Sequence, residues 1–565
     1  MTIPEALVGR SLKRREDARF LRGAGRYVDD VAAPDALHAV VVRSPHGHAE
    51  FAAIDTAAAR AAPGVRGVFT FADLAAEGIG ALPCIASMPP ACGLVVPPRH
   101  ALADGRVRHA GDAVAFVVAD TVAAAKDAAE LVAADYRMLS AVVDGPAALT
   151  PGAPLLWQEA PGNLAYRYER GDRAAVAAAM EAAAHVVEIE LVNNRLVIVP
   201  IEPRAAIGSY DAASESFDLA ITGQGVHSLH QQLAGAVFRI VPERIRVSAP
   251  DVGGGFGVKN FLYPEWVLVL FAARRLGRPV RWVAERGEEF LSSAQGRDNV
   301  TKGRLALDAD GRFLALEAET VANLGAYLST NGPGSSTNST ANAMGGVYAI
   351  PAIFMGVSGA FTNTVPIDAY RGAGKPEANY LIERLVDRAA HQLGIDRVEL
   401  RRRNMVASFP YRMALGNVID CGGFTANLAT AAGQIGDLAA RKAASAKRGR
   451  LRGLGIAAFL ETARGAPNEG AEIRFAPGGE VSLHLGTQSN GQGHETSFAQ
   501  IAADLLGLPI DNFRLVQADT REVRAGNGHG GARSMHQGGA ALHRAAQMVI
   551  AKGRDVAARL LQAEP

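Results

Sequence analysis

Cysteine is scarce in this sequence. Its 565 residues include three cysteines, Cys84, Cys92 and Cys421, and no two of them form a CxxC pair. This excludes a disulfide-stapled scaffold. It also excludes a cysteine-ligated iron–sulfur cluster, because such a cluster needs about four thiolates. Free thiols are typical of proteins from a reducing compartment, which favours a cytoplasmic location.

The sequence has no excess of charge of either sign. It carries 58 basic and 57 acidic residues, and aromatic residues make up 6% of the chain. A protein that binds nucleic acid needs a positive surface to attract phosphates, commonly with aromatic side chains interleaved. We therefore expect no nucleic-acid partner.

Long apolar runs are also missing. The longest, around Trp266 to Ala273, is far shorter than the roughly 20 residues that span a bilayer. The N-terminus from Met1 to Asp17 is polar and has no apolar core of the kind a signal peptide needs. These absences predict a cytoplasmic protein with no membrane partner.

Three widespread functional motifs do not fit the sequence. A dinucleotide fingerprint that began at Gly253 would need glycine at position 258, which is Val258. A phosphate-binding loop would need Ser or Thr after Gly374 and Lys375, but Pro376 follows them. The zinc motif HEXXH is absent. A nicotinamide dehydrogenase, one alternative for a glycine-rich chain, therefore lacks its usual signature.

The composition is that of an ordinary globular protein, with 48% hydrophobic and 20% charged residues. The length suits about three to four domains of roughly 100–200 residues. In the first region, residues 1–150, short apolar runs predict strands at 37–42 and 113–118. An alanine-rich stretch predicts a helix at 121–134 with Thr121 as its N-cap. Residues 151–162 are rich in proline and glycine and predict a linker.

Two further regions follow, and both mix strands with helices. Residues 163–405 predict strands at 186–192 and 313–319, a helix at 377–393, and a long loop at 331–346. Residues 411–565 predict a half-buried strand at 481–485 and a final helix over 538–561. The fold class is therefore α+β throughout.

The first glycine-rich loop runs from Asp251 to Lys259, after a strand-like run at 245–248. Glycines let a backbone turn tightly and approach a ligand closely, and exposed N–H groups in such a turn bind anions. The candidate binding residues here are Gly254, Gly255, Phe256 and Gly257. The alternative is a tight turn without a ligand.

A second loop, Ala369 to Glu377, has Arg371 before a flexible turn and a helix that begins near Pro376. An arginine at the mouth of a helix N-terminus suits a phosphate or another oxyanion. The alternative is a surface arginine beside a helix cap.

The third and fourth loops lie in the last region. Residues 486–496 contain Gln492 between two glycines, and an amide with donor and acceptor ends suits a heterocycle such as a pterin. Residues 528–539 form a polar glycine-rich loop directly before the final helix, where the helix dipole favours anions.

Four glycine-rich, anion-friendly loops in one chain imply one large polyanionic ligand. Over nearly its whole length the chain resembles the molybdopterin-binding large subunit of the xanthine dehydrogenase/aldehyde oxidase family. The resemblance is carried, in family order, by residues 16–30, 43–49, 107–115, 202–204, 253–259, 369–374, 383–387, 491–496 and 532–534.

This resemblance implies a hammerhead-type α/β domain at 1–150, a molybdopterin-binding domain at 163–405 and a second, partial one at 411–565. Molybdenum would be held by the dithiolene of the pterin, so no protein metal ligand is expected. The residues expected to hold the cofactor are Gln224, Gly254, Gly255, Phe256, Gly257, Arg371, Gln492, Gly493, His494, Ala532, Arg533, Ser534 and Gln537.

The resemblance also implies a reaction, the hydroxylation of an aldehyde or N-heterocycle C–H with water as the oxygen source. The implied cofactor is molybdenum-molybdopterin cytosine dinucleotide. Electrons would pass to [2Fe-2S] and FAD. Because this chain lacks the cysteines for such clusters, they are expected on a small [2Fe-2S] subunit and an FAD subunit.

Several departures from the family pattern bear on the reaction and on the cofactor, among them Ala532, which stands where a serine is frequent. Gly372 stands where carbon monoxide dehydrogenases carry a copper-binding cysteine, and Asn260 stands where purine-oxidising members carry a glutamate. The GxGE motif with the general-base glutamate is absent, so no catalytic residue is assigned. A missing base costs about 10²–10⁴-fold in rate. We therefore expect a C-terminally incomplete subunit with its base on a separate fragment, or a non-catalytic remnant that still binds the cofactor.

Overall fold

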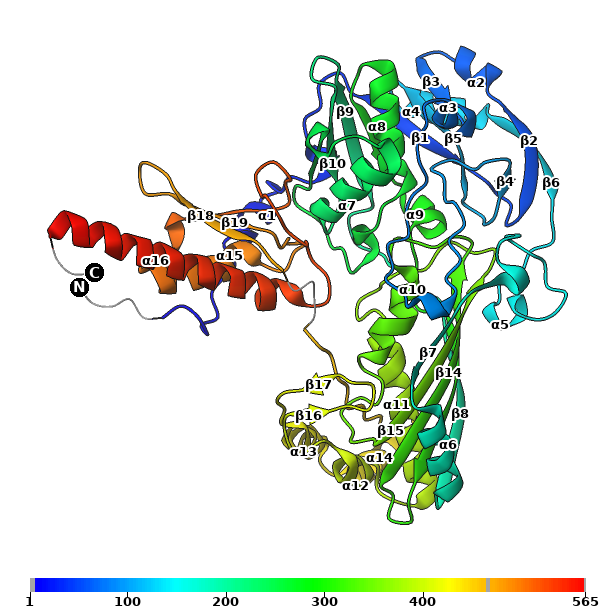
Figure 1. The fold of residues 1–565 in the computed structure, drawn as a ribbon, viewed down its shortest axis with the longest axis vertical. Coiled ribbons are helices and arrows are strands. Elements are labelled where there is room, and N and C mark those ends of the chain that lie inside the picture. The colour runs from blue at the N-terminus through cyan, green and yellow to red at the C-terminus, as the bar shows by residue number, and fades with distance from the viewer. Residues whose placement is uncertain (1–5, 464–467, 563–565) are drawn as a thin grey trace.

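The computed structural model describes residues 6–463 and 468–562, so the first five residues of the polar N-terminus lie outside the described part. The chain forms two stacked layers and an arm, which we define as residues 468–562 (Figure 1). The upper layer is built around a seven-stranded sheet and the lower layer around a five-stranded sheet. No described helix is long and apolar enough to cross a membrane.

The seven-stranded sheet joins segments from two regions of the sequence. Its strand order is β11 (Ile245–Ser248), β10 (Ser216–Ile221), β9 (Ala205–Asp211), β12 (Val280–Val283), β1 (Leu37–Arg43), β5 (Ala113–Ala119) and β3 (Val65–Phe69). β1 lies parallel to β12, with Leu37 opposite Val280. The first region therefore shares one sheet with residues 205–283.

Helix α8 (Pro264–Leu276) packs on this sheet and explains the longest apolar run. Trp266 to Ala273 are all buried inside it. The run is long because the helix is covered on all sides within the core.

Most expected elements of the first region are confirmed, including β1, β5 and an N-cap at Thr121. The Thr121 hydroxyl accepts a hydrogen bond from the Ala124 N–H at 3.1 Å. The expected helix ends early, because α4 covers only Val122–Glu130. The chain then enters β6 (Ala133–Met138), which pairs with β2 (Ala49–Asp55), so a long-range pairing overrides the local helical pattern.

The lower layer holds the longest strands. Their order is β7 (Leu164–Gly171), β15 (Ala352–Phe361), β14 (Phe313–Gly325), β13 (Asn299–Leu307) and β8 (His185–Asn193). Helices α6 (Arg173–Ala182) and α11 (Lys375–Leu393) pack on this sheet. The predicted strands and the predicted helix of this region are thereby confirmed, and Pro376 lies in the first turn of α11 as expected.

The prediction of a long loop at 331–346 is wrong. The segment forms the short helix α10 (Gly332–Gly334) and a π-helical turn at Ser335–Ser339, and most of it is buried. Its small hydroxyl side chains bond to the backbone: Thr337 Oγ1 donates to the Pro333 carbonyl at 2.7 Å. Such local bonds satisfy the polar groups and allow a serine- and threonine-rich segment to enter the core.

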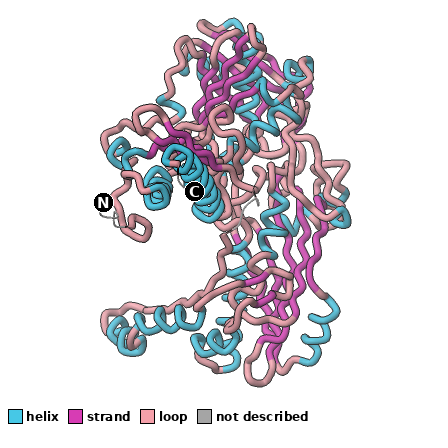
Figure 2. Tube along the Cα trace, turned by 60° about the vertical axis from the view of Figure 1, so that its left-hand side comes forward, coloured by secondary structure: helices cyan, strands magenta, loops and turns pink. Residues whose placement is uncertain are grey.

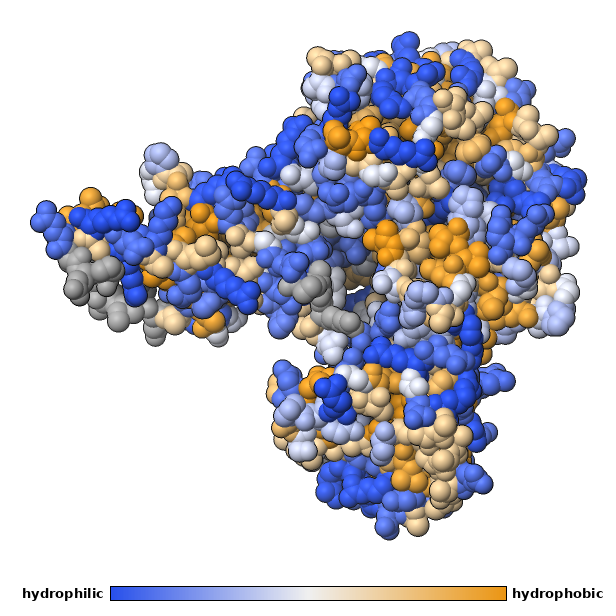
Figure 3. Space-filling view, in the orientation of Figure 1, coloured by the Kyte–Doolittle hydropathy of each residue, from blue (hydrophilic) through white to orange (hydrophobic). Residues whose placement is uncertain are grey.

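The arm consists of β18 (Ala471–Phe475), β19 (Val481–Leu485) and β20 (Phe513–Val516), with α15 (His494–Leu506) and α16 (Gly539–Leu561) packed against them. The strand at 481–485 and the final helix are as predicted. The N-terminal segment with α1 (Asp17–Phe20) lies against the arm (Figures 1 and 2). Figure 3 shows a recess between the arm and the two layers.

Shorter elements complete the described fold: α2 (Ala57–Ala61), α3 (Phe71–Ala76), α5 (Gly145–Ala148), α7 (Val226–Gln232), α9 (Arg286–Ser292), α12 (Arg397–Asn404), α13 (Phe424–Ile435), α14 (Leu438–Ala446), β4 (Arg106–Val107), β16 (Tyr411–Arg412) and β17 (Val418–Ile419).

Candidate cofactor site

Gln224 joins two of the predicted loops. Its side-chain oxygen accepts the N–H of Gly257 at 2.8 Å and the N–H of Lys259 at 3.3 Å. Its carbonyl accepts the N–H of His529 at 2.7 Å, and its Nε2 donates to the His529 carbonyl at 3.4 Å. Gln224 is buried, and both polar atoms of its side-chain amide have hydrogen-bond partners. The arm therefore contacts the upper layer through this residue.

The first glycine loop has a backbone that few side chains allow. φ is +86° at Gly254, +55° at Phe256 and +112° at Gly257. A Cβ on Gly257 would lie 2.0 Å from the Ala369 carbonyl oxygen, so glycine is required there. The φ of Phe256 is also positive, which is unfavourable for a residue with a Cβ, and its side chain is 46% exposed.

Two N–H donors of this loop stay open. None of the described residues accepts a hydrogen bond from the backbone N–H of Gly255 or of Phe256, although Gly253, Gly254 and Gly257 all donate. Gly255 is buried. A buried N–H normally finds a partner, so this pair suits an oxygen-rich ligand.

Arg371 of the second loop lies next to the first loop. Its backbone N–H donates to the Phe256 carbonyl at 2.9 Å. Arg297 fixes the same turn by donating to the carbonyls of Tyr370 at 2.9 Å and Arg371 at 2.8 Å. The Arg371 side chain is exposed, and the N-terminus of α11 behind it carries no side-chain cap.

The third and fourth loops are bonded to each other inside the arm. Thr487 Oγ1 donates to Ser534 Oγ at 2.7 Å, and the Gly528 N–H donates to the Gly486 carbonyl at 3.0 Å. Gln488 Nε2 donates to the Gly223 carbonyl, beside Gln224. The four predicted loops therefore converge on one region.

The third loop carries the amide side chains of Gln492, which was predicted as a site residue, and of Asn490, for which no role was predicted. Gln492 is exposed, and its side-chain oxygen accepts the N–H of Asn490 within the same turn. Asn490 is 8% exposed, and neither its side-chain oxygen nor its nitrogen has a partner among the described residues. The buried amide that can bind a heterocycle is thus Asn490. An Asn before Gly is typical of an ordinary turn, which hides this signal in the sequence.

His494 begins α15, directly after Gly493, whose φ is +84°. Burial lowers the pKa of His494 to about 4, and the neighbouring His529 adds to the effect. Its ring centroid lies 5.1 Å from that of Phe498. His494 is therefore neutral at pH 7.

Arg533 and Ser534 are buried and hold the fourth loop in place. Arg533 Nη1 pairs with Glu469 Oε2 at 2.6 Å, and the His529 Nδ1 lies 2.9 Å from the Ser534 hydroxyl. Ala532 is exposed with φ +55°, and Gln537 is half-buried. Glu469 was not predicted as a site residue, because no local sequence pattern links it to Arg533, which lies more than sixty positions later.

A cavity of about 380 Å³ lies between the first and third loops, and the N-terminal segment forms its remaining wall. No role of that segment was predicted from the sequence. The lining includes Gly254 and Gly493 of the predicted residues, together with Arg14, Glu16, Asp17, Arg19, Phe20, Leu21, Tyr27, residues 250–253, Ser489, Asn490, Gly491, Glu495 and Gln517.

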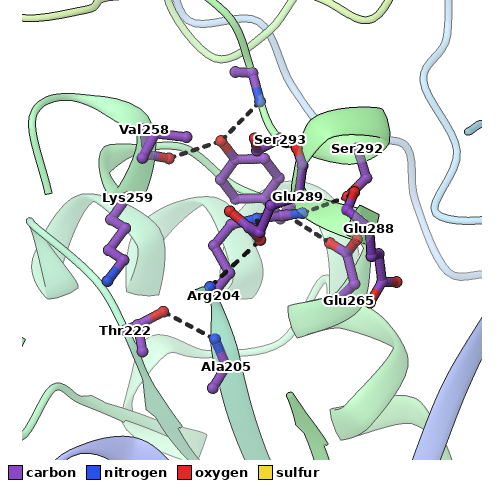
Figure 4. Close-up of polar contacts among 12 residues, drawn as sticks. Arg204, Ala205, Thr222, Val258, Lys259, Glu265, Glu288, Glu289, Ser292 and Ser293 are labelled. Atoms are coloured by element: carbon purple, nitrogen blue, oxygen red, sulfur yellow. Dashed lines mark hydrogen bonds and ion pairs between the residues drawn. The ribbon is translucent and has the colours of Figure 1, made fainter. Parts of the chain in front are cut away.

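A cluster of buried charged side chains lies next to the first loop. Glu202 and Arg204 lie two positions apart in the sequence, but they bind different partners. Arg204 donates to Glu289 at 2.8 Å and Glu265 at 3.1 Å (Figure 4). Its guanidinium lies 3.9 Å from the ring centroid of Tyr263. The Tyr263 hydroxyl in turn donates to the Val258 carbonyl of the loop at 2.7 Å.

The residues present fit the cofactor that the resemblance implies. Adjacent open N–H groups suit oxygen atoms, and the buried Asn490 amide suits a heterocycle with a donor and an acceptor. Within the described residues, no group of three or more His, Cys, Asp or Glu side chains is arranged to hold a metal ion.

Three family models match most of the chain. Two family models described as molybdopterin cofactor-binding domains match residues 156–405 and 429–565. A third, the aldehyde oxidase and xanthine dehydrogenase a/b hammerhead domain, matches residues 22–140.

Individual relatives match almost the whole chain. The carbon monoxide dehydrogenase large chain of Hydrogenophaga pseudoflava is 33% identical over 97% of this chain and 71% of its own length. The nicotine 6-hydroxylase large subunit of Paenarthrobacter nicotinovorans is 32% identical over 99% of this chain and 70% of its own length.

A solved structure shows the same arrangement. Quinoline 2-oxidoreductase from Pseudomonas putida 86 superimposes with a TM-score of 0.92 at 34% identity, covering 100% of this chain and 74% of that one. The chain therefore belongs to the xanthine dehydrogenase/aldehyde oxidase family of molybdenum hydroxylases, as a molybdopterin-binding large subunit.

Proposed function

We propose that this chain is the substrate-oxidising subunit of a molybdenum hydroxylase that hydroxylates an aldehyde or N-heterocycle C–H with water. When bound, the molybdenum cofactor supplies the oxidant that takes up two electrons from the substrate. The observation that carries the proposal is the pair of open N–H donors at Gly255 and Phe256, held in place by Gln224. Such fixed donors stabilise oxygen atoms on which negative charge develops.

The other loops are assigned to the rest of the cofactor. Arg371 lies beside Phe256, and its exposed side chain is suited to bind a phosphate. Gln492, Gly493 and His494 surround the pterin in this proposal, with Asn490 added as the amide that binds its polar edge. Ala532, Arg533, Ser534 and Gln537 form the loop for the dinucleotide tail.

The cofactor form and the partners are part of the proposal. We assign molybdopterin cytosine dinucleotide, and [2Fe-2S] and FAD on separate subunits. The relatives' names, "large chain" and "large subunit", support a complex of several chains. The three cysteines support the same view, because one chain with three thiols lacks the roughly four ligands of a cluster.

An N-heterocycle is the substrate class that the sequence and the relatives favour. Gly372 carries no side chain that could bind copper, which argues against carbon monoxide, and Asn260 argues against xanthine. A nicotine hydroxylase and a quinoline oxidoreductase among the relatives favour an N-heterocycle. The relatives are enzymes, which disfavours a non-catalytic remnant. The chain binds and orients in this proposal, and no general base is assigned to it, because GxGE is absent.

The experiment is purification of the chain with its companion subunits from cells supplied with molybdate. Elemental analysis should give molybdenum near one per chain, and acid hydrolysis should release cytidine monophosphate. A panel of aldehydes, N-heterocycles, xanthine and carbon monoxide then defines the substrate class. Protein that carries neither a pterin nor molybdenum would overturn the proposal.

A further inference from the structure

The N-terminal strap, which we define as residues 14–26, is attached to the third loop and to the start of α15. Arg14 Nη1 donates to the Gly491 carbonyl at 3.0 Å, and the Arg15 N–H donates to the Thr496 hydroxyl at 2.8 Å. The same hydroxyl donates to Glu16 at 2.6 Å. These contacts hold the strap on the arm.

The far end of the strap is attached to the first glycine loop. The Arg26 N–H donates to Asp251 Oδ2 at 2.8 Å, and the Asp251 N–H donates back to the Arg26 carbonyl at 2.9 Å. Asp251 precedes the first glycine of the loop by two residues. The strap therefore spans the cavity from the arm to the upper layer.

Arg19 lies in the middle of the strap and binds both sides at once. Its guanidinium donates to both oxygens of Asp251, at 2.9 Å for Nη2 to Oδ1, and Nη2 also donates to Glu495 Oε1 at 2.5 Å. Its charge lies 4.2 Å from the ring centroid of Phe20. Hydrogen bonds to the carboxylates, chiefly that of Asp251, raise the pKa of Arg19 against a smaller effect of burial, so the group stays charged.

We propose that Arg19 is a positioning residue that sets the spacing between the first and third loops across the cavity. The inference rests on the proposed function, because those loops are taken to hold the cofactor. Only a planar guanidinium can donate to two carboxylates in different directions from one rigid fork. Lysine keeps the charge but loses this geometry.

The role is separable from general stability. The side chains of Arg19, Glu495 and Asp251 are 33%, 39% and 18% exposed, and partly exposed ion pairs add little to the stability of a fold. A change at Arg19 should therefore loosen the two loops while the rest of the protein stays folded.

The test uses the purified multi-subunit complex and the variants Arg19→Gln, Arg19→Lys and Arg22→Gln. Arg22 lies on the same strap and is exposed, but its guanidinium donates to the Ala18 carbonyl, away from both loops. Loss of molybdenum and cytidine nucleotide after dilution should be about tenfold faster in Arg19→Gln, a factor expected for a lost charged hydrogen bond. Arg19→Lys should lie between, and Arg22→Gln should match the wild type.

Hydrogen exchange provides a second measurement that needs no cofactor. Peptides covering 250–257 and 489–497 should both exchange faster in Arg19→Gln, while peptides from the five-stranded sheet stay unchanged. If wild-type protein contains no cofactor, the proposed function fails, and exchange alone decides the role of Arg19. Unchanged exchange in both peptides, or equal cofactor loss in Arg19→Gln and Arg22→Gln, would overturn the inference.

Glu495→Gln is a second variant that tests the same contact if Arg19→Gln fails to fold. It removes one arm of the bridge and should show a smaller increase in cofactor loss. Combined with Arg19→Gln, it should add nothing, because both changes act on one contact. Additive effects would contradict the assignment.

Discussion

Lys259 Nζ and Glu202 Oε2 form an ion pair of 3.0 Å in the interior, and the same carboxylate oxygen accepts the Gly253 N–H at 2.7 Å. Lys259 is completely buried, and burial lowers its pKa against the opposing effect of Glu202. One carboxylate thereby fixes both ends of the first glycine loop.

Replacing Glu202 should therefore destabilise the protein. Glu202→Gln can still accept the Gly253 N–H but leaves the Lys259 ammonium buried without a counter-charge. We expect a loss of about 3 kcal/mol in unfolding free energy, the usual cost of breaking a buried pair from one side. Urea unfolding measures it. Glu215→Gln, which breaks the exposed pair with Arg244, should change stability by less than about 1 kcal/mol. Equal losses of stability in Glu202→Gln and Glu215→Gln would contradict this role of Glu202.

Glu265 should make the protein sensitive to acid. Burial opposes ionisation of Glu265, but Arg204 and Arg43 outweigh it and hold its pKa at about 2. A depressed folded pKa gives stability that is present above the unfolded value near 4.5 and is lost as pH falls toward 2. The loss is about 3 kcal/mol. Unfolding measured from pH 6 to pH 2.5 should show it, and Glu265→Gln should flatten that part of the profile.

His494 should act in a different pH window. Its folded pKa of about 4 lies below its unfolded value near 6.5, so the unfolded chain binds more protons between the two. Stability is complete above pH 6.5 and falls as pH drops toward 4, by about 2 kcal/mol at pH 5. His494→Leu should lose less stability than the wild type between pH 7 and pH 5. An unchanged slope would show that His494 is not neutral in the folded protein.

Asn490 and Gln492 offer a matched pair in one loop. Asn490→Leu removes a buried amide with an open donor and acceptor and should weaken cofactor binding about tenfold. Gln492→Leu removes an exposed amide that bonds within its own turn and should have a smaller effect. Molybdenum per chain, measured in purified protein, compares the two. A larger loss from Gln492→Leu would restore the interpretation based on sequence.

Arg371→Ala should lower the molybdopterin content without unfolding the chain. The side chain is exposed, and Arg371 takes part in the hydrogen bonds of this turn only through its backbone, so the fold does not depend on the side chain. Arg384→Ala on the same helix, α11, is the control. Unchanged cofactor occupancy in Arg371→Ala would remove Arg371 from the site.

Local patterns predicted the elements and the loops well. The strand at 245–248 and the helix after Pro376 follow from apolar spacing and proline placement. The glycine-rich patterns indicated four loops, and these loops lie together in one region beside Gln224. Contacts between distant segments could not be predicted, because neither partner carries a local signal: Arg533 with Glu469, or Arg19 with Asp251 and Glu495. The Asn490 side chain was missed because its burial and its unpaired donor and acceptor appear only in the folded chain.

The pairing of β1 with β12 has a consequence for synthesis. Leu37 emerges from the ribosome long before Val280, its neighbour in the sheet. Until then β1 presents an open edge, and unpaired edges invite aggregation. Nascent chains halted before residue 280 should therefore depend on chaperones, and a hammerhead fragment expressed alone should precipitate where the longer chain stays dissolved.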